Sequence, residues 1–438
     1  MPVSAGHGGA PHIQSDLLGG ADAPGMTAAR EVELEGHIID SGMMGAAFGI
    51  IMDLGGSFDV EEFRIGRHEN EESYARLLVE AEDEETLQSI VHELHQNGAN
   101  PSDPRDATLQ RAPKDKVVPH GFYSTTNHPT EVRVDGEWVA VEDIEMDCAV
   151  LVEGVGDDDA DPRAYTAVLS GVEEGDFVVT GETGIRVNPP ERPRDREGAF
   201  GFMQGGVSSE RPSESTIRQV GDAIEETKRE GGTVLAVCGP ALIHSGARED
   251  MARLVREGFV DMLSIGNGFA VHDLERDLYG TSLGMDTESL DHPRKGHKHH
   301  IYTISEVIRE GGIEDAVESG TVESGVMYEC VENDVPFVVA GSIRDDGPLP
   351  DTITDSTEAQ NAIREQAHEA DLVLMLSTLL HSVAVGNCLP STTRTVCVDI
   401  NPATVTQLLD RGSDQAVGMV TDIGTFVPIL TDHLLDEA

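Results

Sequence analysis

The run TVLAVCG (233–239) decides the fold of this chain, because five further runs of the same kind follow it. Each run is short, apolar and rich in β-branched residues, and helical stretches separate the runs. Near-continuous apolar strands that alternate with helices predict a parallel sheet covered on both faces. We therefore expect an α/β domain over residues 201–438. The later runs are DMLSIGNG (261–268), PFVVAGS (336–342), ADLVLMLST (370–378), TRTVCVDIN (393–401) and AVGMVTDIG (416–424).

A smaller α+β domain is expected upstream, over residues 29–110. Its pattern reads strand, helix, strand, strand, helix, which is typical of a ferredoxin-like unit. The second helix is well marked, because apolar residues recur at helical spacing from Leu87 to Leu94 and Asn97-Gly98 ends the pattern. The expected strands cover 32–39, 57–66 and 73–82, and the first helix covers about 43–54.

Residues 111–200 form a third region, which we expect to be a small β module followed by a linker. VRVDGEWVAVE (132–142) predicts a hairpin, because Asp-Gly between alternating apolar residues is a strong turn signal. NPPERPRDREG (188–198) has three prolines and few apolar residues, as linkers do. Residues 1–28 lack an apolar core and a basic start, so they predict a disordered tail and not a signal peptide.

The composition narrows the class of partner. The net charge is −51, from 81 acidic against 30 basic residues. Such a charge repels phosphate backbones and anionic membranes, which favours a small-molecule ligand and excludes nucleic acid and membrane as partners. A uniformly acidic surface also suits a salt-rich cytoplasm. The five cysteines are far apart and contain no CxxC pair, so we expect reduced, buried thiols and no metal site. Without a signal peptide or an apolar run of membrane-spanning length, the protein is expected to be cytoplasmic. We also expect a homo-oligomer.

A ligand of an open parallel sheet lies beyond the carboxyl ends of its strands. Asp399 ends one expected strand and could accept the hydroxyls of an adenosine ribose, which would favour NAD over NADP; the alternative is a helix N-cap. Asn267-Gly268 follows another strand and could approach a phosphate or form a turn with positive φ. Asp346 and Asp422 lie at two further strand ends. The G-x-G-x-x-G fingerprint is absent, which predicts a departure from a standard Rossmann unit.

Several histidines are candidates for polar chemistry. His244, His272 and His381 each lie just beyond a strand, where an imidazole can carry protons in a cleft, although a buried structural histidine is equally compatible with this position. The run GHKHHIYTI (296–304) suggests a metal site, but no carboxylate or cysteine partner is fixed near it. A loop, or hydrogen bonds from these side chains to a ligand, explains the histidine run better than a metal site does.

Several long motifs together resemble the archaeal ornithine cyclodeaminase family. This family is related to the C-terminal part of a cyanobacterial arginine-degrading enzyme and to the conserved region of lysine-oxoglutarate reductase/saccharopine dehydrogenase. The resemblance implies conversion of L-ornithine to L-proline and ammonia, with NAD+ as a recycled cofactor. The motifs are EGHIIDSGMMGAAFGIIMDLGGSFDVEEFRIG (35–66), GFYSTTNHPTEVRVDGEWV (121–139), GPALIHSGA (239–247), GNGFAVHDLERDLYGTSLGMD (266–286), LSTLLHSVAVGN (376–387) and VCVDINPATVTQLLDRG (396–412).

The stretch VDINPATVTQLLDRG (398–412) also resembles the nucleotide-binding domain of deoxyhypusine synthase, so we expect a sheet of that type. The family resemblance further implies a set of NAD contacts. The proton carrier is not fixed by it, and we expect His272, Asp273 or His244. Two alternatives stay open: an NAD-dependent amino-acid oxidoreductase of the saccharopine or lysine type, and a non-catalytic sensor of NAD and an amino acid. The implied NAD contacts are Asn267, Gly268, Asp346, Thr378, Leu379, Leu380, His381, Asp399, Asp422 and Ile423.

Overall fold

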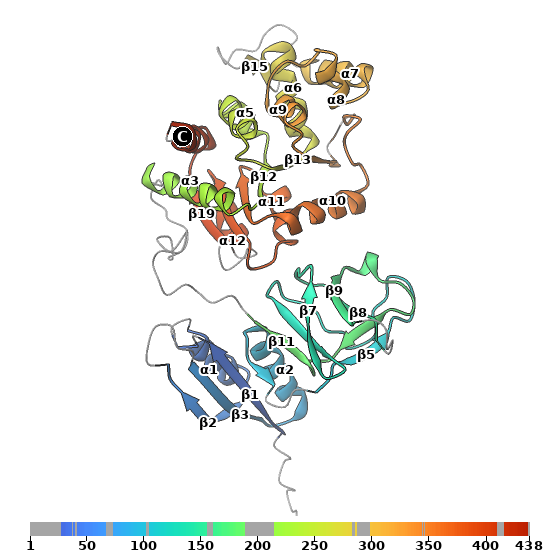
Figure 1. Cartoon of the computed structure of the whole chain (residues 1–438), viewed down its shortest axis with the longest axis vertical. Coiled ribbons are helices and arrows are strands. Elements are labelled where there is room, and N and C mark those ends of the chain that lie inside the picture. The colour runs from blue at the N-terminus through green and yellow to red at the C-terminus, as the bar shows by residue number, and fades with distance from the viewer. Residues whose placement is uncertain are drawn as a thin grey trace, which may run out of the picture.

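The chain forms three units (Figure 1). An N-terminal unit and a β unit lie side by side at one end, and an α/β unit forms the other end. The computed structural model describes residues 28–36, 38–39, 42–66, 73–101, 105–155, 161–188, 214–282, 285–286, 298–343, 345, 347–409 and 416–436.

The N-terminal unit is an antiparallel sheet with two helices. Its strand order, β2-β3-β1-β4, is that of a ferredoxin-like unit. Buried and half-buried residues alternate along β3, as one covered sheet face requires, and the Asp83 side chain caps α2 by accepting from the backbone N–H of Thr86 at 2.7 Å. The elements are β1 (Ala28–Gly36), α1 (Met43–Asp53), β2 (Ser57–Arg64), β3 (Ser73–Ala81), α2 (Glu84–Gln96) and β4 (Asn100–Pro101).

The β unit is a seven-stranded sheet in the order β11-β6-β7-β9-β8-β10-β5. The predicted hairpin is present, with Asp135 and Gly136 at φ values of 51° and 87° in its two-residue turn. The expected boundary near residue 110 falls inside β5, which pairs with β10 and so belongs to this unit. The strands are β5 (Thr108–Arg111), β6 (Thr130–Val134), β7 (Glu137–Glu142), β8 (Ala149–Glu153), β9 (Arg163–Ala167), β10 (Phe177–Thr180) and β11 (Ile185–Val187).

The six expected strands of the α/β unit are all present and all parallel, in the order β16-β13-β12-β17-β18-β19. Counted along the chain, this is the order 3-2-1-4-5-6 of a doubly wound Rossmann sheet. The predicted departure from a standard Rossmann unit is therefore wrong for the topology and holds only for the glycine fingerprint. The strands are β12 (Val234–Cys238), β13 (Met262–Gly266), β16 (Phe337–Ala340), β17 (Leu372–Leu376), β18 (Arg394–Asp399) and β19 (Ala416–Val420).

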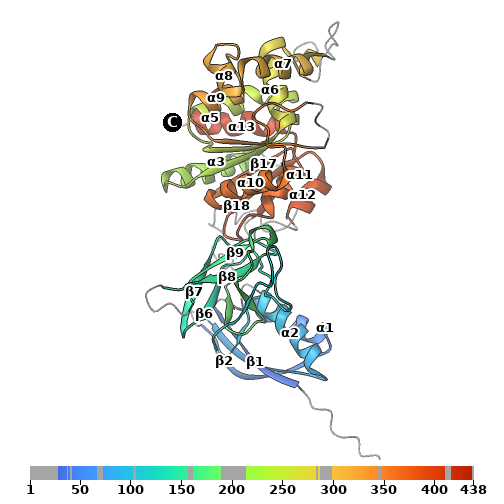
Figure 2. The same cartoon turned by 90° about the vertical axis from the view of Figure 1, so that its right-hand side faces the viewer.

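Helices cover both faces of this sheet, as its apolar strands require (Figure 2). A large buried cluster fills one face and a second cluster fills the face under α10, α11 and α12. All five cysteines are buried and form no disulfide, which confirms the expected thiols. The helices are α3 (Glu214–Arg229), α4 (Ala241–His244), α5 (Arg248–Arg256), α6 (Asn267–Tyr279), α7 (His299–Glu310), α8 (Ile313–Glu318), α9 (Val326–Glu332), α10 (Ser356–Glu369), α11 (Leu380–Gly386), α12 (Pro402–Leu409) and α13 (Ile423–Asp436).

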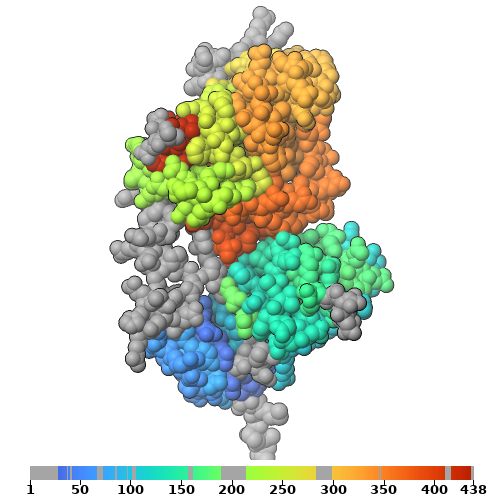
Figure 3. Space-filling model, viewed as in Figure 1, coloured from blue at the N-terminus to red at the C-terminus, as the bar shows by residue number. Residues whose placement is uncertain are grey.

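The β unit docks onto α10 and the loop that precedes β18 (Figure 3). Glu145 is almost fully buried there and accepts from Arg364 Nε at 2.5 Å. His128 Nδ1 lies 3.0 Å from Ser391 Oγ. These contacts lie toward the amino ends of β17 and β18, so they leave the carboxyl ends of the sheet uncovered. No helix among the described residues is long and apolar enough to cross a membrane.

Candidate active site

The strand order reverses between β12 and β17, and the loops that leave these two strands touch there. A Cβ atom on Gly239 would lie 2.1 Å from the carbonyl oxygen of Ser377 and 2.9 Å from Cβ of Thr378. Ser377 itself has a φ of 51°, which a residue with a side chain adopts only under constraint. This contact lies at the switch point of the sheet, the place where doubly wound sheets bind their ligands.

Helix α6 begins at Asn267, directly at the end of β13. Asn267 Oδ1 accepts from the backbone N–H of Leu349 at 3.0 Å and from the Thr352 hydroxyl at 2.9 Å, so this side chain holds the loop that follows β16. Gly268 lies in the first helical turn and not in the left-handed region. The alternative that Asn267-Gly268 is a turn with positive φ is therefore wrong, and the N–H groups of a helix start are directed at this edge.

The segment after β17 presents apolar side chains to the outside and one imidazole to the inside. Leu379 and Leu380 are 39% and 81% exposed, next to Thr378 at the switch point. His381 Nε2 lies 2.9 Å from Oγ of the fully buried Ser264, and burial lowers the pKa of His381 to about 4. His381 is therefore neutral and ties α11 to β13, which gives it a structural position rather than one for proton transfer.

Two acidic residues at neighbouring strand ends shape their loops. Asp399 Oδ1 accepts from the Asn401 N–H at 2.8 Å, while Asn401 itself caps α12 through the Ala403 N–H at 3.0 Å. The alternative that Asp399 is the N-cap is therefore wrong. Asp422 Oδ1 accepts from the Gly424 N–H at 2.6 Å at the start of α13, and Ile423 is buried in the core. Asp346 lies outside the described residues.

His244 and His272 lie beside each other at this edge. Their ring centroids are 5.2 Å apart, and His244 Nδ1 lies 2.8 Å from Ser282 Oγ. Burial lowers the pKa of His244, the charge of His272 lowers it further, and Glu275 opposes the shift. His244 is therefore a neutral imidazole near neutral pH. The structure brings together two of the three residues that were expected to carry protons.

A buried carboxylate, which the sequence reasoning missed, orients one of these rings. Glu275 is fully buried, and its Oε2 lies 3.1 Å from His272 Nδ1. Its Oε1 accepts from the Thr281 hydroxyl at 2.8 Å, and Thr281 Oγ1 lies 2.8 Å from His299 Nδ1. A carboxylate only accepts, so His272 carries a proton on Nδ1, which leaves Nε2 as the ring atom that can exchange a proton with a ligand. The spacing of three residues on α6 was the available signal.

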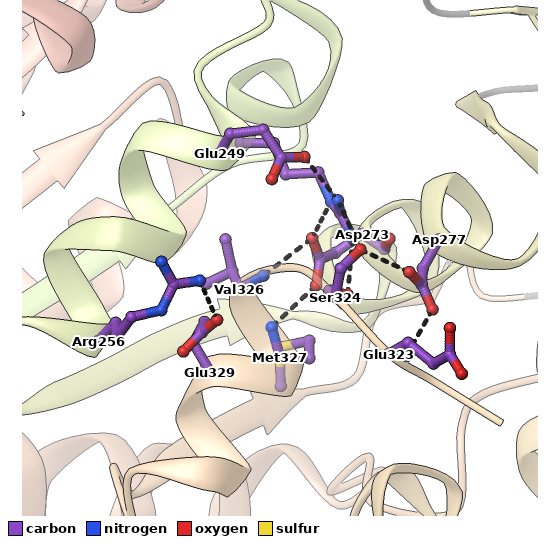
Figure 4. Close-up of polar contacts among 10 residues, drawn as sticks. Glu249, Arg256, Asp273, Asp277, Glu323, Ser324, Val326, Met327 and Glu329 are labelled. Atoms are coloured by element: carbon purple, nitrogen blue, oxygen red, sulfur yellow. Dashed lines mark hydrogen bonds and ion pairs between the residues drawn. The ribbon is translucent and has the colours of Figure 1, made fainter. Parts of the chain in front are cut away.

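Asp273 has a different role from the one expected. Figure 4 shows its carboxylate accepting from the backbone N–H groups of Val326 and Met327, at 3.2 and 2.8 Å, at the start of α9. The same carboxylate accepts from Nε of the buried Arg248 at 2.7 Å, and Arg248 also donates to the Ser324 carbonyl at 2.8 Å. Asp273 is fully enclosed in this network. The expectation that Asp273 carries protons is wrong; it is a buried structural anchor.

The histidine run does not form a metal site in the part of the chain that the structure describes. His299 and His300 begin α7, and His297 lies outside the described residues. No cluster of three or more metal-ligating side chains occurs among the described residues.

The residues at the carboxyl edge fit a dinucleotide. Gly239 and Ser377 let two backbones meet where a pyrophosphate must come close, and the N–H groups at the start of α6 suit its charge. Leu380 and Ile400, which are 81% and 70% exposed, offer apolar surface for flat rings, and Asp399 ends the strand beside them. A cofactor fits here because its charged, apolar and hydroxyl-bearing parts each have a matching surface.

Three family models match consecutive parts of the chain. Residues 29–128 match the LOR/SDH bifunctional enzyme conserved region. Residues 129–217 match the first region of the C-terminal part of the ArgZ-like arginine dihydrolases, and residues 218–430 match the Rossmann fold of that same part.

Known relatives match almost the whole chain. The ornithine cyclodeaminase of Methanothermobacter thermautotrophicus is 53% identical over 408 residues, which cover 92% of this chain and 97% of the relative. The ornithine cyclodeaminase of Methanopyrus kandleri is 50% identical, and the match covers 93% of this chain and 98% of the relative. The bifunctional arginine dihydrolase/ornithine cyclodeaminase AgrE of Nostoc is 43% identical over 93% of this chain and 58% of its own.

Solved structures agree with these matches. The apo structure of ArgZ, an arginine dihydrolase from cyanobacteria, is 38% identical with a TM-score of 0.82 and covers 96% of this chain and 60% of its own. AgrE has been solved as a ternary complex with ornithine and NAD+, at 42% identity and a TM-score of 0.51 over 94% of this chain and 58% of its own. About half of the residues are identical to those of archaeal relatives over their whole length, so the chain belongs to the ornithine cyclodeaminase family, whose members are NAD-dependent ammonia-lyases.

Proposed function

We propose that this protein converts L-ornithine to L-proline and ammonia with NAD+ as a recycled cofactor. The observation that carries the proposal is that the switch point of the sheet and an oriented imidazole pair lie at the same carboxyl edge of the α/β unit. The family relationship supports the reaction, and the AgrE complex with ornithine and NAD+ supports the ligands.

The cofactor would be held by the residues that the carboxyl edge presents. We assign the pyrophosphate to the start of α6 at Asn267-Gly268, the ribose to Asp399 and the flat rings to the segment Thr378–Leu380. When bound, NAD+ supplies reversible hydride acceptance, so that the substrate is oxidised and reduced again without net redox change.

The chain itself must move protons, because L-ornithine brings ammonium groups and releases one nitrogen as ammonia. A neutral imidazole is the suitable acceptor for an ammonium proton. The lowered pKa of His244 keeps it neutral, and Glu275 holds His272 with Nε2 as the acceptor. We assign proton transfer to this pair, with Glu275 as the positioning residue.

Product stoichiometry tests the proposal. Purified protein is incubated at high salt with L-ornithine and NAD+, and proline, ammonia and absorbance at the NADH band are followed together. We expect equal amounts of proline and ammonia without accumulation of NADH. NADH that accumulates in step with ornithine loss would instead identify an amino-acid oxidoreductase, and bound NAD+ without turnover would identify a sensor.

A further inference from the structure

A two-residue strand, β14 (Thr281–Ser282), is tied to both histidines of the candidate active site. Both of its residues are 2% exposed. Consecutive side chains of a strand point to opposite sides, so the two hydroxyl groups reach different neighbours. Ser282 Oγ lies 2.8 Å from His244 Nδ1, whereas the Thr281 hydroxyl donates to Glu275 Oε1 at 2.8 Å. The strand therefore contacts His244 directly and His272 through Glu275.

The hydrogen bonds around Thr281 run in one direction. A hydroxyl group has a single proton, and Thr281 donates it to Glu275 Oε1, because a carboxylate only accepts. The Thr281 oxygen must then accept from His299 Nδ1, which lies 2.8 Å away. The chain of donors runs from His299 through Thr281 to Glu275, where the Nδ1–H group of His272 arrives from the other side. In such a chain, each member determines what the next one can donate.

The orientation of the Glu275 carboxylate depends on these donors. Glu275 has no exposed surface, and a buried carboxylate is costly unless hydrogen-bond donors or positive charges satisfy it. Thr281 donates to Oε1 while His272 donates to Oε2, so the two bonds together fix the rotation of the carboxylate about its last bond. Loss of the Thr281 donor removes one of the two bonds and leaves His272 less firmly oriented.

The first member of the chain is itself held from another side. His299 is the first residue of α7, and α7 packs against α6. The ring of His299 stacks on Tyr279, with the ring centroids 4.9 Å apart and an angle of 22° between the rings. This stacking fixes the plane of the imidazole and thereby the direction in which Nδ1 donates.

We propose that Thr281 and His299 are positioning residues, which hold Glu275 so that His272 keeps its proton on Nδ1 and presents Nε2 to the ligand. The inference rests on the proposed function, because it concerns the same proton transfer. Both residues act through Glu275 and not on the substrate itself. The hydroxyl group of Thr281 and the Nδ1–H group of His299 are therefore what the reaction requires of these two side chains.

Two pairs of variants of the full-length protein test the proposal by turnover of L-ornithine with NAD+. Thr281→Val keeps the shape without the hydroxyl group, and Thr281→Ser keeps the hydroxyl group. His299→Phe keeps the aromatic ring without the donor, and His299→Asn keeps a donor near the position of Nδ1. We expect kcat to fall about tenfold in the valine and phenylalanine variants, with KM within a factor of about three, and to stay within a factor of about three in the serine and asparagine variants.

Thr303→Val is the matched control. Thr303 is a fully buried threonine of α7 whose hydroxyl group has no hydrogen-bond partner among the described residues. Its replacement should leave kcat unchanged. If Thr281→Val does not fold, the two variants of His299 decide the question.

The tautomer of His272 gives a second measurement that does not depend on activity. In the cofactor-free protein labelled with 15N-histidine, NMR distinguishes a ring nitrogen that carries a proton from one that does not, and His272→Gln identifies the signals of this ring. We expect the Nδ1–H form in the unaltered protein and in Thr281→Ser, and a mixture of both tautomers in Thr281→Val. A protein that does not convert ornithine would refute the proposed function, whereas the His272 signals would still decide the positioning.

Three outcomes overturn the inference. The first is a Thr281→Val protein with unchanged kcat and unchanged His272 signals. The second is an equal loss of kcat in Thr281→Ser and Thr281→Val, since the hydroxyl group would then not be the group that matters. The third is an equal loss in Thr303→Val, which would show that any buried threonine of this region has the same effect.

Discussion

The Nδ1 atom of His272 lies 3.1 Å from Oε2 of Glu275, a carboxylate that has no exposed surface and lies one helical turn further along α6. Such a pair fixes both the tautomer and the orientation of the imidazole. The arrangement therefore determines which ring nitrogen of His272 can exchange a proton with a ligand.

Replacement of Glu275 by glutamine should slow turnover without weakening substrate binding. The amide can still fill the space, but it no longer enforces a proton on His272 Nδ1. We expect kcat to fall by about one to two orders of magnitude with KM nearly unchanged, and the pH profile of kcat to shift. Glu306→Gln on the outer helix α7 serves as the control, and an equal loss of kcat there would contradict the positioning role.

The two imidazoles should each be needed for chemistry but not for cofactor binding. In His244→Ala and His272→Ala, kcat should fall by about 10²- to 10⁴-fold, the range for loss of a general acid or base. The Kd for NAD+, measured by titration, should stay within a factor of about three. Unchanged turnover in both variants would remove the pair from the reaction.

Asp273 should matter for stability and not for proton transfer. Its removal in Asp273→Ala leaves the buried Arg248 guanidinium with only the exposed Glu249 carboxylate and leaves the first N–H groups of α9 without their acceptor. Breaking a buried pair of this kind costs about 3–5 kcal/mol, which denaturant unfolding can measure. Glu214→Gln, which breaks an exposed pair with Arg218, should leave the unfolding midpoint unchanged. A stable Asp273→Ala protein without activity would restore Asp273 as a catalytic candidate.

Two glycines should differ sharply in their tolerance of a methyl group. A Cβ on Gly239 meets the Ser377 carbonyl oxygen at 2.1 Å, whereas a Cβ on Gly45, in helix α1 of the N-terminal unit, meets nothing within 4 Å. Gly239→Ala must therefore separate the two loops at the switch point, and we expect the Kd for NAD+ to rise at least about tenfold. Gly45→Ala should bind NAD+ much as the unaltered protein does. Equal affinities in the two variants would argue against a cofactor at the switch point.

Acid should destabilise the protein through His381. The pKa of His381 is about 4, well below the value of about 6.5 in an unfolded chain. The unfolded state therefore binds more protons, so the stability from this group is complete above pH 6.5 and is lost as the pH falls from 6.5 to 4. In His381→Gln, the fall of the melting temperature over this window should be shallower. An unchanged slope would show that His381 is not buried in neutral form.

The sequence predicts most of the architecture, because hydrophobic periodicity determines it. All six strands of the parallel sheet and the hairpin at Asp135-Gly136 occur where the pattern indicates them. Because the glycine fingerprint is absent, a departure from the Rossmann topology was expected, and this was wrong. A fingerprint describes one turn, whereas strand order depends on the packing of every helix against the sheet. The expected boundary near residue 110 falls inside β5 because β5 is short and its partner β10 lies far along the chain, so the local pattern does not show to which unit β5 belongs.

The site was predicted only in part, for a physical reason. Strand ends can be read from a sequence, so His244 and His272 were expected at this edge, where their rings lie beside each other. What the sequence does not show is the direction in which a side chain points from its helix. Asp273 follows His272 directly, yet on an α-helix this places it on a different face, in the network with Arg248. Glu275, three residues from His272, shares the face of that histidine and was missed.

The fate of the α-hydrogen of ornithine tests the central claim most directly. L-Ornithine that carries deuterium at the α-carbon is converted in the presence of NAD+ and excess unlabelled NADH, and the proline is analysed by mass spectrometry. If the cofactor is recycled within one site, the deuterium returns to the α-carbon and the proline retains it. Proline with hydrogen at that position, or deuterium that collects in the dissolved NADH, would contradict the account.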